Sequence, residues 1–383
     1  MNGYLARVIE EVKGKHGDEP EFVQTVEEVF SSLEPVIEQH PEYEAADLLS
    51  RMVEPERTFS FRVTWMADDG TWHTNTGYRT QFNGAIGPYK GGLRFRKDVN
   101  LGIIKFLAFE QTFKNALTGL PIGSGKGGSD FDPKGKSDME IMRFCQAYMQ
   151  ALYRYIGPDV DVPAGDMGVG GREIGYLFGE YRRLKGAWEN GVLTGKGFSY
   201  GGSLIRPEAT GYGAVYYLQN VLEHEGERIA GKTIACAGFG NVTWGICKKA
   251  AQLGAKVVTL SGPDGYIYDP DGVATEEKIA YLVEMRSSGR NRVQDYAEKF
   301  GVEFFPGEKP WGVKADVVMP SAMQNDVHLD SAKKITQAGV KYYVEVANMP
   351  TTNDALKYLM DCGLIVAPSK AVNAGGVATS ALE

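Results

Sequence analysis

Short apolar runs alternate with helical patterns through the second half of this 383-residue sequence. The predicted strands cover residues 233–237, 256–261, 317–320, 341–347 and 364–367, and the predicted helices cover residues 241–253, 276–285 and 329–338. Strands that alternate with helices are joined by crossovers, which gives a parallel sheet with helices on both faces. The sequence therefore predicts a doubly wound α/β domain in its second half.

The first half of the chain follows another pattern. Residues 4–53 are predicted to form helices, because apolar residues recur at helical spacing. Pro41 separates the last two of these helices. The period changes to two at residues 59–65, and after an Asp-Asp-Gly turn a second alternating run covers residues 72–82. This pattern predicts a β-hairpin, so the first half also combines helices with strands.

The length of the chain predicts two domains, since a domain usually has about 150 residues. A glycine-rich loop lies at residues 197–203, and a helical run follows from Pro207 to about Glu225. We therefore expect an N-terminal α/β domain at residues 1–202 and a Rossmann-like doubly wound domain at residues 203–383. Two domains imply a cleft.

The charge balance excludes some classes of function and suggests another. The net charge is −8, which argues against a broad nucleic-acid surface. Residues 88–136 nevertheless hold nine Lys or Arg against four Asp or Glu, and glycine is unusually frequent in the chain, at 48 residues. Cations among glycines predict a local site for an anion.

The sequence also lacks signals for export, for a membrane span and for a cysteine-based site. No signal peptide and no run of about 18 apolar residues is found, so we expect a cytoplasmic protein that spans no membrane. The spacing of the four cysteines indicates neither a metal site nor a disulfide framework.

The apolar run at residues 233–237 leads into Gly238-Phe239-Gly240-Asn241-Val242 and then into a helix. A strand, a G-x-G turn and a helix in this order are typical of dinucleotide binding. Gly238 would make the tight turn, and Gly240 would let backbone N–H groups approach a pyrophosphate at the helix N-terminus. Thr243 occupies the third position of the motif, where glycine or alanine is usual.

The choice of cofactor is expected at the end of the next strand, where the sequence is Ser261-Gly262-Pro263-Asp264. No lysine or arginine stands there to bind a 2′-phosphate, and Asp264 would repel one if it points inward. NAD is therefore favoured over NADP. Asp264 is otherwise a simple turn residue.

Residues 123–128, Gly-Ser-Gly-Lys-Gly-Gly, invite comparison with a phosphate-binding P-loop. The spacing does not fit, because Leu120 takes the place of the first glycine and Gly127 the place of Ser or Thr. Lys126 is instead a candidate general base, and Asp166, in a glycine-flanked loop, is a candidate proton-transfer partner. The five histidines lie in polar contexts, which argues against histidine-based hydroxy-acid dehydrogenases.

Seven motifs spread over the whole chain together resemble the glutamate dehydrogenases of the bacterial hexameric type. They are Pro88-Tyr-Lys-Gly-Gly92, Glu110-Gln-Thr-Phe-Lys114, Gly123-Ser-Gly-Lys-Gly-Gly-Ser-Asp130, Pro163-Ala-Gly-Asp166, Arg206-Pro-Glu-Ala-Thr-Gly-Tyr-Gly213, Gly238-Phe-Gly-Asn-Val242 and Asn373-Ala-Gly-Gly-Val-Ala-Thr-Ser380. The resemblance implies a first domain for substrate binding and oligomerisation, a second for the dinucleotide, and a homohexamer.

The resemblance also implies roles for individual residues. Lys90 and Ser380 would bind the side-chain carboxylate of glutamate, Gln111 and Lys114 its α-carboxylate, and the Gly165 backbone would contact the substrate. Lys126 would be the catalytic lysine, with Asp166 as its proton-transfer partner. Thr210 and residues 238–242, with Asn241 among them, would bind the cofactor. The implied reaction is oxidative deamination of glutamate to 2-oxoglutarate and ammonia.

Two alternatives stay open at this point. A leucine-, phenylalanine- or valine-type amino-acid dehydrogenase would share the fold, but it would have no use for cations at the distal end of the substrate pocket. Members of the resembled family continue beyond the position of Glu383 with helices that return to the first domain, which we expect to be absent here. A catalytically silent, shortened subunit is therefore the second alternative.

Overall fold

The computed structural model describes residues 2–205, 208–287 and 292–383. It forms two compact units, residues 1–203 with residues 380–383, and residues 204–379. The sequence assigns the last four residues to the second domain, but here they belong to the first unit. The reason is Glu383, whose carboxylate accepts hydrogen bonds from the backbone N–H groups of Gly195 and Lys196.

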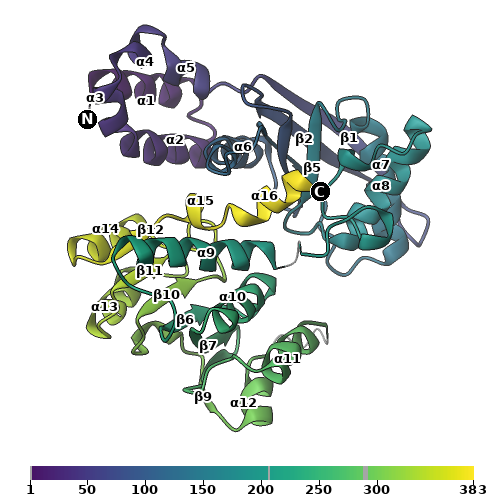
Figure 1. Ribbon diagram of the computed structural model, residues 1–383. Helices are drawn as coiled ribbons and strands as arrows, with labels where there is room; N and C mark the ends of the chain where they lie inside the picture. Colours follow the sequence, from purple (N-terminus) through teal and green to yellow (C-terminus); the bar gives the residue numbers. More distant parts are fainter. Residues whose placement is uncertain (1, 206–207, 288–291) are drawn as a thin grey trace. The chain divides into compact units, whose positions relative to one another are not determined.

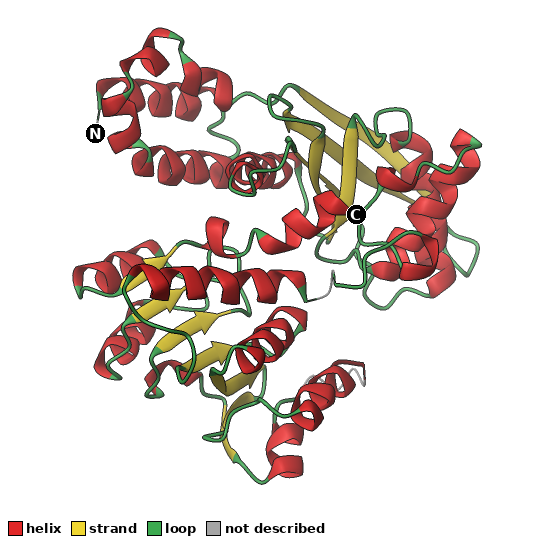
Figure 2. Cartoon of the chain, viewed as in Figure 1, coloured by secondary structure: helices red, strands yellow, loops and turns green. Residues whose placement is uncertain are grey.

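The first unit is built on a mixed five-stranded sheet with the order β1-β2-β4-β3-β5. The predicted hairpin is present as its antiparallel β1 and β2, and β3 runs parallel to both β4 and β5. Figure 2 shows this sheet in yellow. The strands are β1 (Arg57–Met66), β2 (Trp72–Asn83), β3 (Tyr89–Phe95), β4 (Ser124–Ser129) and β5 (Asp161–Gly165).

Two hydrophobic cores in the first unit lie on opposite faces of this sheet. On one face, α6 packs with the N-terminal helices, and on the other face α7 and α8 pack on β1 and β3. The helices are α1 (Gly3–Lys15), α2 (Pro20–Ser32), α3 (Glu34–Gln39), α4 (Pro41–Ala45), α5 (Leu48–Met52), α6 (Leu101–Ala116), α7 (Asp138–Leu152) and α8 (Gly171–Lys185).

The second unit is built on a seven-stranded sheet with the order β12-β11-β10-β6-β7-β8-β9. Its first five strands run parallel, as the sequence predicts, whereas β8 and β9 are antiparallel additions at one edge. Only two residues join β7 to β8, which is too short for a crossover and gives a hairpin. The strands are β6 (Thr233–Ala237), β7 (Lys256–Gly262), β8 (Gly265–Tyr268), β9 (Glu303–Pro306), β10 (Val317–Pro320), β11 (Tyr342–Val344) and β12 (Ile365–Ala367).

Helices cover both faces of the second sheet, so the predicted doubly wound α/β architecture is confirmed. One core contains residues of α9 to α12, and the other contains residues of α13 and α14. Pro207, the predicted start of α9, lies outside the described residues. The helices are α9 (Ala209–His224), α10 (Asn241–Gln252), α11 (Glu276–Ser287), α12 (Gln294–Phe300), α13 (Leu329–Gln337), α14 (Asn353–Asp361), α15 (Ser369–Val372) and α16 (Gly375–Leu382). Among the described residues, no helix combines the length and the apolar character needed to span a membrane.

Candidate active site

Lys90 lies on β3, and its ammonium group is buried within the first unit. Its Nζ donates to Thr194 Oγ1 at 2.6 Å and to the carbonyl oxygen of Val162 at 3.3 Å. The residue is only 2% exposed. A buried ammonium group is costly unless polar or anionic groups surround it, so this position is suited to binding a carboxylate.

Lys126 and Asp166, the predicted catalytic residues, form an ion pair. Lys126 is the third residue of β4, Asp166 directly follows β5, and Lys126 Nζ lies 2.9 Å from Asp166 Oδ2. Burial by itself would raise the pKa of Asp166, but the cations of Lys126 and Arg94 hold that pKa well below its usual range. Asp166 is therefore a carboxylate at neutral pH and can accept a proton.

Glycines bring the strands close together beside this pair. A Cβ on Gly92 would lie 2.8 Å from both Asp166 Cβ and the carbonyl oxygen of Gly165, and one on Gly91 would lie 1.6 Å from the carbonyl oxygen of Gly125. Any larger residue at positions 91 or 92 would push the strands apart. The high glycine content of this region thus has a steric cause.

Helix α6 carries Gln111 and Lys114 and is attached to the same strands through Asn115. The Asn115 side chain is fully buried and donates to the carbonyl oxygens of Lys90 at 3.1 Å and Gly123 at 2.6 Å. It also accepts a hydrogen bond of 2.6 Å from Gln111 Nε2. Gln111 and Lys114 are three residues apart and therefore share one face of the helix.

Gly165 ends β5, and Ser380 is the first of the residues that return to the first unit. Ser380 is buried, at 2% exposure. The first unit thus contains every residue predicted to bind the substrate or to catalyse: Lys90, Gln111, Lys114, Lys126, Gly165, Asp166 and Ser380.

The predicted dinucleotide motif lies at the junction of β6 and α10 in the second unit. Gly238 has φ +98°, a left-handed conformation that favours glycine, and its N–H donates to Ser261 Oγ at 2.9 Å. Gly240 is the N-cap of α10, and Asn241 and Val242 are in the first turn. Thr210 lies in the first turn of α9, which packs against α10. This loop and helix N-terminus fit a pyrophosphate group.

The Thr243 side chain explains the departure from the usual motif. Its hydroxyl group lies 2.8 Å from Ser321 Oγ, and Ser321 Oγ in turn donates to the carbonyl oxygen of Ala237. A Cβ on Gly238 would lie 2.9 Å from Thr243 Oγ1, so the small residue at position 238 leaves the space that this hydroxyl group needs.

Asp264 lies in the turn between β7 and β8, and its carboxylate is fixed. It accepts hydrogen bonds from the backbone N–H groups of Val293 at 3.1 Å and Gln294 at 3.0 Å, at the start of α12. A Cβ on Gly262 would lie 2.7 Å from Asp264 Oδ1 and 3.2 Å from Phe239 Cε1. The Asp264 carboxylate and the Phe239 ring therefore both face the carboxyl end of β7.

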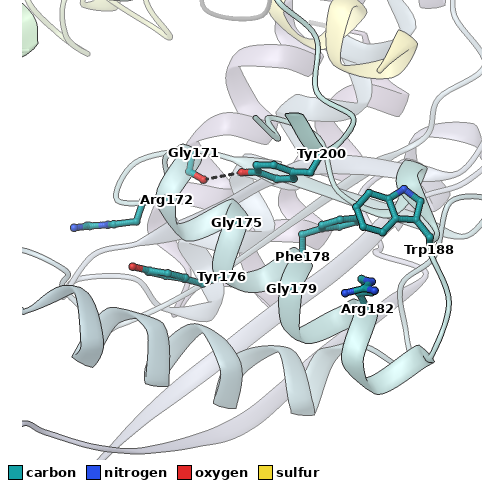
Figure 3. A pocket seen from close by; sticks show the side chains of 9 residues that line it. All are labelled: Gly171, Arg172, Gly175, Tyr176, Phe178, Gly179, Arg182, Trp188 and Tyr200. Carbon is teal, nitrogen blue, oxygen red and sulfur yellow. Dashed lines mark hydrogen bonds between the residues drawn. The ribbon is translucent and has the colours of Figure 1, made fainter. Parts of the chain in front are cut away.

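A surface groove of about 370 Å³ is found elsewhere in the first unit. In Figure 3 the rings of Phe178, Trp188 and Tyr200 and the side chain of Arg182 surround it along α8. None of the predicted site residues lines this groove. Within the described part of the chain, no group of three or more His, Cys, Asp or Glu side chains could hold a metal ion.

Sequence reasoning missed three side chains that organise the site: Arg94, Asn115 and Thr194. Arg94 contacts Asp166, and Thr194 accepts the hydrogen bond from Lys90. Arg94 follows Lys90 by four residues on one strand, so the period of two places both on the same face, and this signal was available. Thr194 lies 104 residues from Lys90, and no local pattern indicates that contact.

Comparison with known protein families gives two matches to this chain. Residues 201–383 match the family described as Glutamate/Leucine/Phenylalanine/Valine dehydrogenase, and residues 55–183 match the Glu/Leu/Phe/Val dehydrogenase dimerisation domain. The two matches cover the second unit and most of the first.

Individual relatives are also similar over nearly the whole chain. The NAD-specific glutamate dehydrogenase of Clostridium symbiosum is 68% identical over 100% of this chain and 85% of its own length. The NADP-specific glutamate dehydrogenase of Haemophilus influenzae is 54% identical over 100% of this chain and 84% of its own length.

A solved Plasmodium falciparum glutamate dehydrogenase has a TM-score of 0.95 and 48% identity, and the match covers 99% of this chain and 80% of that one. Identity of this extent, together with the two family matches and the shared fold, establishes the relationship. The chain belongs to the Glu/Leu/Phe/Val dehydrogenase family.

Proposed function

We propose that this chain is a glutamate dehydrogenase that catalyses the reversible, NAD-dependent oxidative deamination of L-glutamate to 2-oxoglutarate and ammonia. The observation that carries the proposal is the buried ion pair of Lys126 and Asp166, on the same small sheet as the buried ammonium group of Lys90. The relatives named glutamate dehydrogenase at 54% identity and above support the choice of substrate.

The substrate carries two carboxylates, and the first unit offers cations for both. Lys90 and Ser380 bind the side-chain carboxylate, while Gln111 and Lys114 bind the α-carboxylate. Each charged hydrogen bond of this kind contributes roughly 1.5–3 kcal/mol. Asn115 keeps both groups of ligands in register, because it bonds to the Lys90 backbone and to Gln111. The Gly165 backbone contacts the substrate at the end of β5.

Lys126 and Asp166 are the residues that transfer protons in the proposed reaction. A bound nicotinamide supplies the acceptor for the hydride that leaves the α-carbon of glutamate. Asp166 takes a proton from the substrate amino group as the carbon–nitrogen double bond forms. Lys126, after its ammonium group has released a proton to solvent, removes a proton from the water that attacks the imine carbon. It then returns that proton to the nitrogen atom, and ammonia leaves as the hydroxyl group releases its proton to solvent and the carbonyl forms. The low pKa of Asp166 keeps its carboxylate unprotonated before the substrate binds.

The cofactor is held by the second unit, through Thr210, the residues 238–242 and the N-terminus of α10. We propose NAD rather than NADP, and the support for this is the Asp264 carboxylate, which two backbone N–H groups hold at the carboxyl end of β7, where it would repel a nearby 2′-phosphate. In an Asp264→Asn variant, the ratio of kcat/KM for NADP to kcat/KM for NAD should rise about tenfold, which corresponds to about 1.4 kcal/mol. The same change at Asp271, an exposed acidic residue after β8, is the matched control.

The assembly is proposed to be a homohexamer, with the oligomer contacts in the first unit. The match to a dimerisation domain and the resemblance to the hexameric type support this. Sedimentation equilibrium would give a mass six times that of the 41.9 kDa chain.

The deciding experiment follows absorbance at 340 nm with glutamate and NAD, glutamate and NADP, and leucine and NAD. The first mixture should give the fastest rise, and Lys126→Ala should abolish it. A flat trace from a folded protein in all three mixtures would favour a catalytically silent subunit. A faster rise with leucine would favour the branched-chain type of dehydrogenase.

A further inference from the structure

Asp166 has a second cationic partner that the mechanism above does not use. Arg94 Nε lies 3.2 Å from Asp166 Oδ2, the same oxygen that Lys126 Nζ approaches at 2.9 Å. The three side chains are 9% to 19% exposed. One carboxylate therefore stands between two cations, and the group as a whole carries a charge of +1.

The position of Arg94 is set by the sheet rather than by a loop. Arg94 pairs with Gly128 on β4, and the residue before it, Leu93, pairs with Gly165 on β5. Two residues earlier, Gly92 approaches Asp166 so closely that only glycine fits. The guanidinium and the carboxylate are thus carried by neighbouring strands in fixed register, which gives the contact a defined geometry.

Other charged groups near Asp166 already have partners. Arg96 pairs with Asp98, and its Nη1 lies 3.8 Å from Met167 Sδ. Lys196 forms an ion pair with Glu383. The neighbouring residue, Gly195, lies close to Gly165, because a Cβ added at Gly195 would be 3.9 Å from the Gly165 nitrogen. Arg94 and Lys126 are therefore the cations that form ion pairs with this carboxylate, while Arg96 interacts with it only through its charge.

We propose that Arg94 is a positioning residue for proton transfer: its guanidinium fixes the Asp166 carboxylate and keeps the cluster positive, so that the Lys126 ammonium group gives up its proton more readily. The inference rests on the proposed function of Lys126 and Asp166. Without Arg94, Asp166 and Lys126 would form a neutral one-to-one pair, in which the ammonium group keeps its proton more firmly. Arginine suits this task because it stays charged at every relevant pH.

The test compares Arg94→Gln and Arg94→Lys with the control Arg143→Gln, which removes an arginine charge from an ion pair with Asp68 in the same unit and not from Asp166. Steady-state rates are measured against pH. In Arg94→Gln, kcat at neutral pH should fall about tenfold or more, and the rising limb of the pH–rate profile should move up by about one unit, as expected for loss of one near cation. KM for glutamate should stay within about twofold, since Arg94 is not among the proposed carboxylate ligands.

A second readout does not depend on turnover. Acetic anhydride acetylates only the neutral form of a lysine, so the extent of labelling at Lys126, read by mass spectrometry across a pH series, reports when it loses its proton. This labelling curve should shift by about one unit in Arg94→Gln and should stay in place in Arg143→Gln. If the wild-type protein labels as expected but does not oxidise glutamate, the proposed function fails while the inference about Arg94 stands.

Arg94→Lys separates charge from geometry. It should restore the position of both curves, while kcat stays several-fold low because lysine cannot reproduce the planar contact. Unchanged pH and labelling curves in Arg94→Gln would overturn the proposal and leave Arg94 a structural ion pair. Should Arg94→Gln fail to fold, the uncharged variant Arg94→Met takes its place, and unchanged pH and labelling curves in Arg94→Met would overturn the proposal equally.

Discussion

Several ion pairs in the first unit are buried, and they join residues that are distant in the sequence. Arg79 and Asp161, both fully buried, connect β2 with β5, and Arg79 also donates to the Gly91 carbonyl oxygen beside the lysine at position 90. Removing charges from water is costly, so such pairs contribute little net stability but strongly penalise the loss of one partner. In this unit they fix the strands that carry the side chains proposed for catalysis and substrate binding.

Replacement of Lys90 tests the specificity assigned to it. Lys90→Leu removes the cation proposed for the distal carboxylate, so kcat/KM for glutamate should fall at least about a hundredfold, or about 2.7 kcal/mol. Use of an amino acid with an apolar side chain, such as norleucine, should be retained or should rise. The exposed Lys134, changed in the same way, should behave as the wild type. Unchanged glutamate kinetics in Lys90→Leu would show that the pocket lies elsewhere.

The low pKa of Asp166 predicts how stability depends on pH. A carboxyl group with a lowered pKa stabilises the fold above its unfolded value, near 3.9, and this contribution disappears as the pH falls further. Asp166→Asn should therefore lower the free energy of unfolding near pH 7 by roughly 2 kcal/mol, and the difference from the wild type should shrink in acid. Hydrogen exchange of the backbone N–H groups of β5 measures this difference in the free energy of unfolding. The control is Asp138→Asn, because Asp138 belongs to an exposed ion pair. A difference that is constant with pH would contradict the assignment.

At the scale of elements, α6 is the helix that joins the two groups of proposed substrate ligands. Its N-terminus is capped by Asn100, whose side chain accepts from the N–H of Ile103, and its last turn is held by Asn115 against β3 and the start of β4. The helix is thus anchored at both ends. Its face with Gln111 and Lys114 cannot shift without breaking buried hydrogen bonds.

Asn115→Ala is expected to release this anchor. The carbonyl oxygens of Lys90 and Gly123 would lose buried donors, so the free energy of unfolding should fall by about 2–3 kcal/mol. KM for glutamate should rise more than kcat falls, because the helix positions the α-carboxylate ligands and not the proton-transfer pair. Asn220→Ala removes a hydrogen bond within α9 at an exposed position and should change neither quantity. Equal changes in kcat and KM would argue for a general loss of structure instead.

Much of the second unit could be predicted from its sequence, since buried parallel strands are short apolar runs with glycine and helical patterns between them. The predicted strand at residues 233–237 coincides with β6, and that at 317–320 with β10. Strands β8 and β9 and helices α12, α14, α15 and α16 were not predicted. The two strands have four residues each and the helices at most nine, so none gives a long periodic signal.

The candidate site could be predicted less completely. Lys126 and Asp166 were recognisable because glycines surround them, and the structure joins them. The partnerships of Arg94 and Thr194 could not be predicted, because they depend on which strands become neighbours in the sheet. The return of residues 380–383 to the first unit is likewise a long-range event that no local pattern indicates.

At the scale of the whole molecule, the chain returns to its first unit through Glu383. Its carboxylate accepts from the N–H groups of Gly195 and Lys196 and pairs with Lys196 Nζ at 2.9 Å, with both side chains at most 1% exposed. Lys196 also donates to the Leu193 carbonyl oxygen. The loop that supplies Thr194 to Lys90 is thus stabilised from the far end of the sequence.

Glu383→Gln should therefore destabilise the first unit although the residue follows the second one. The Lys196 ammonium group would remain buried without its counter-charge, which costs about 3 kcal/mol or more. Hydrogen exchange of the backbone N–H groups of Gly195 and Lys196 in the first unit, followed by NMR, would measure this. The double variant Lys196→Met/Glu383→Met should recover part of the loss, since no charge is then buried. Full stability of the single variant would show that water replaces the carboxylate at no cost.

The pairing of Lys196 with Glu383 has a consequence for biosynthesis. These residues are 187 positions apart, so a ribosome must translate all of the second unit before the glutamate becomes available. Until then, the nascent first unit has a lysine without its anion next to the threonine that contacts Lys90. The ion pair beside the Thr194 loop therefore forms only after the second unit has been synthesised.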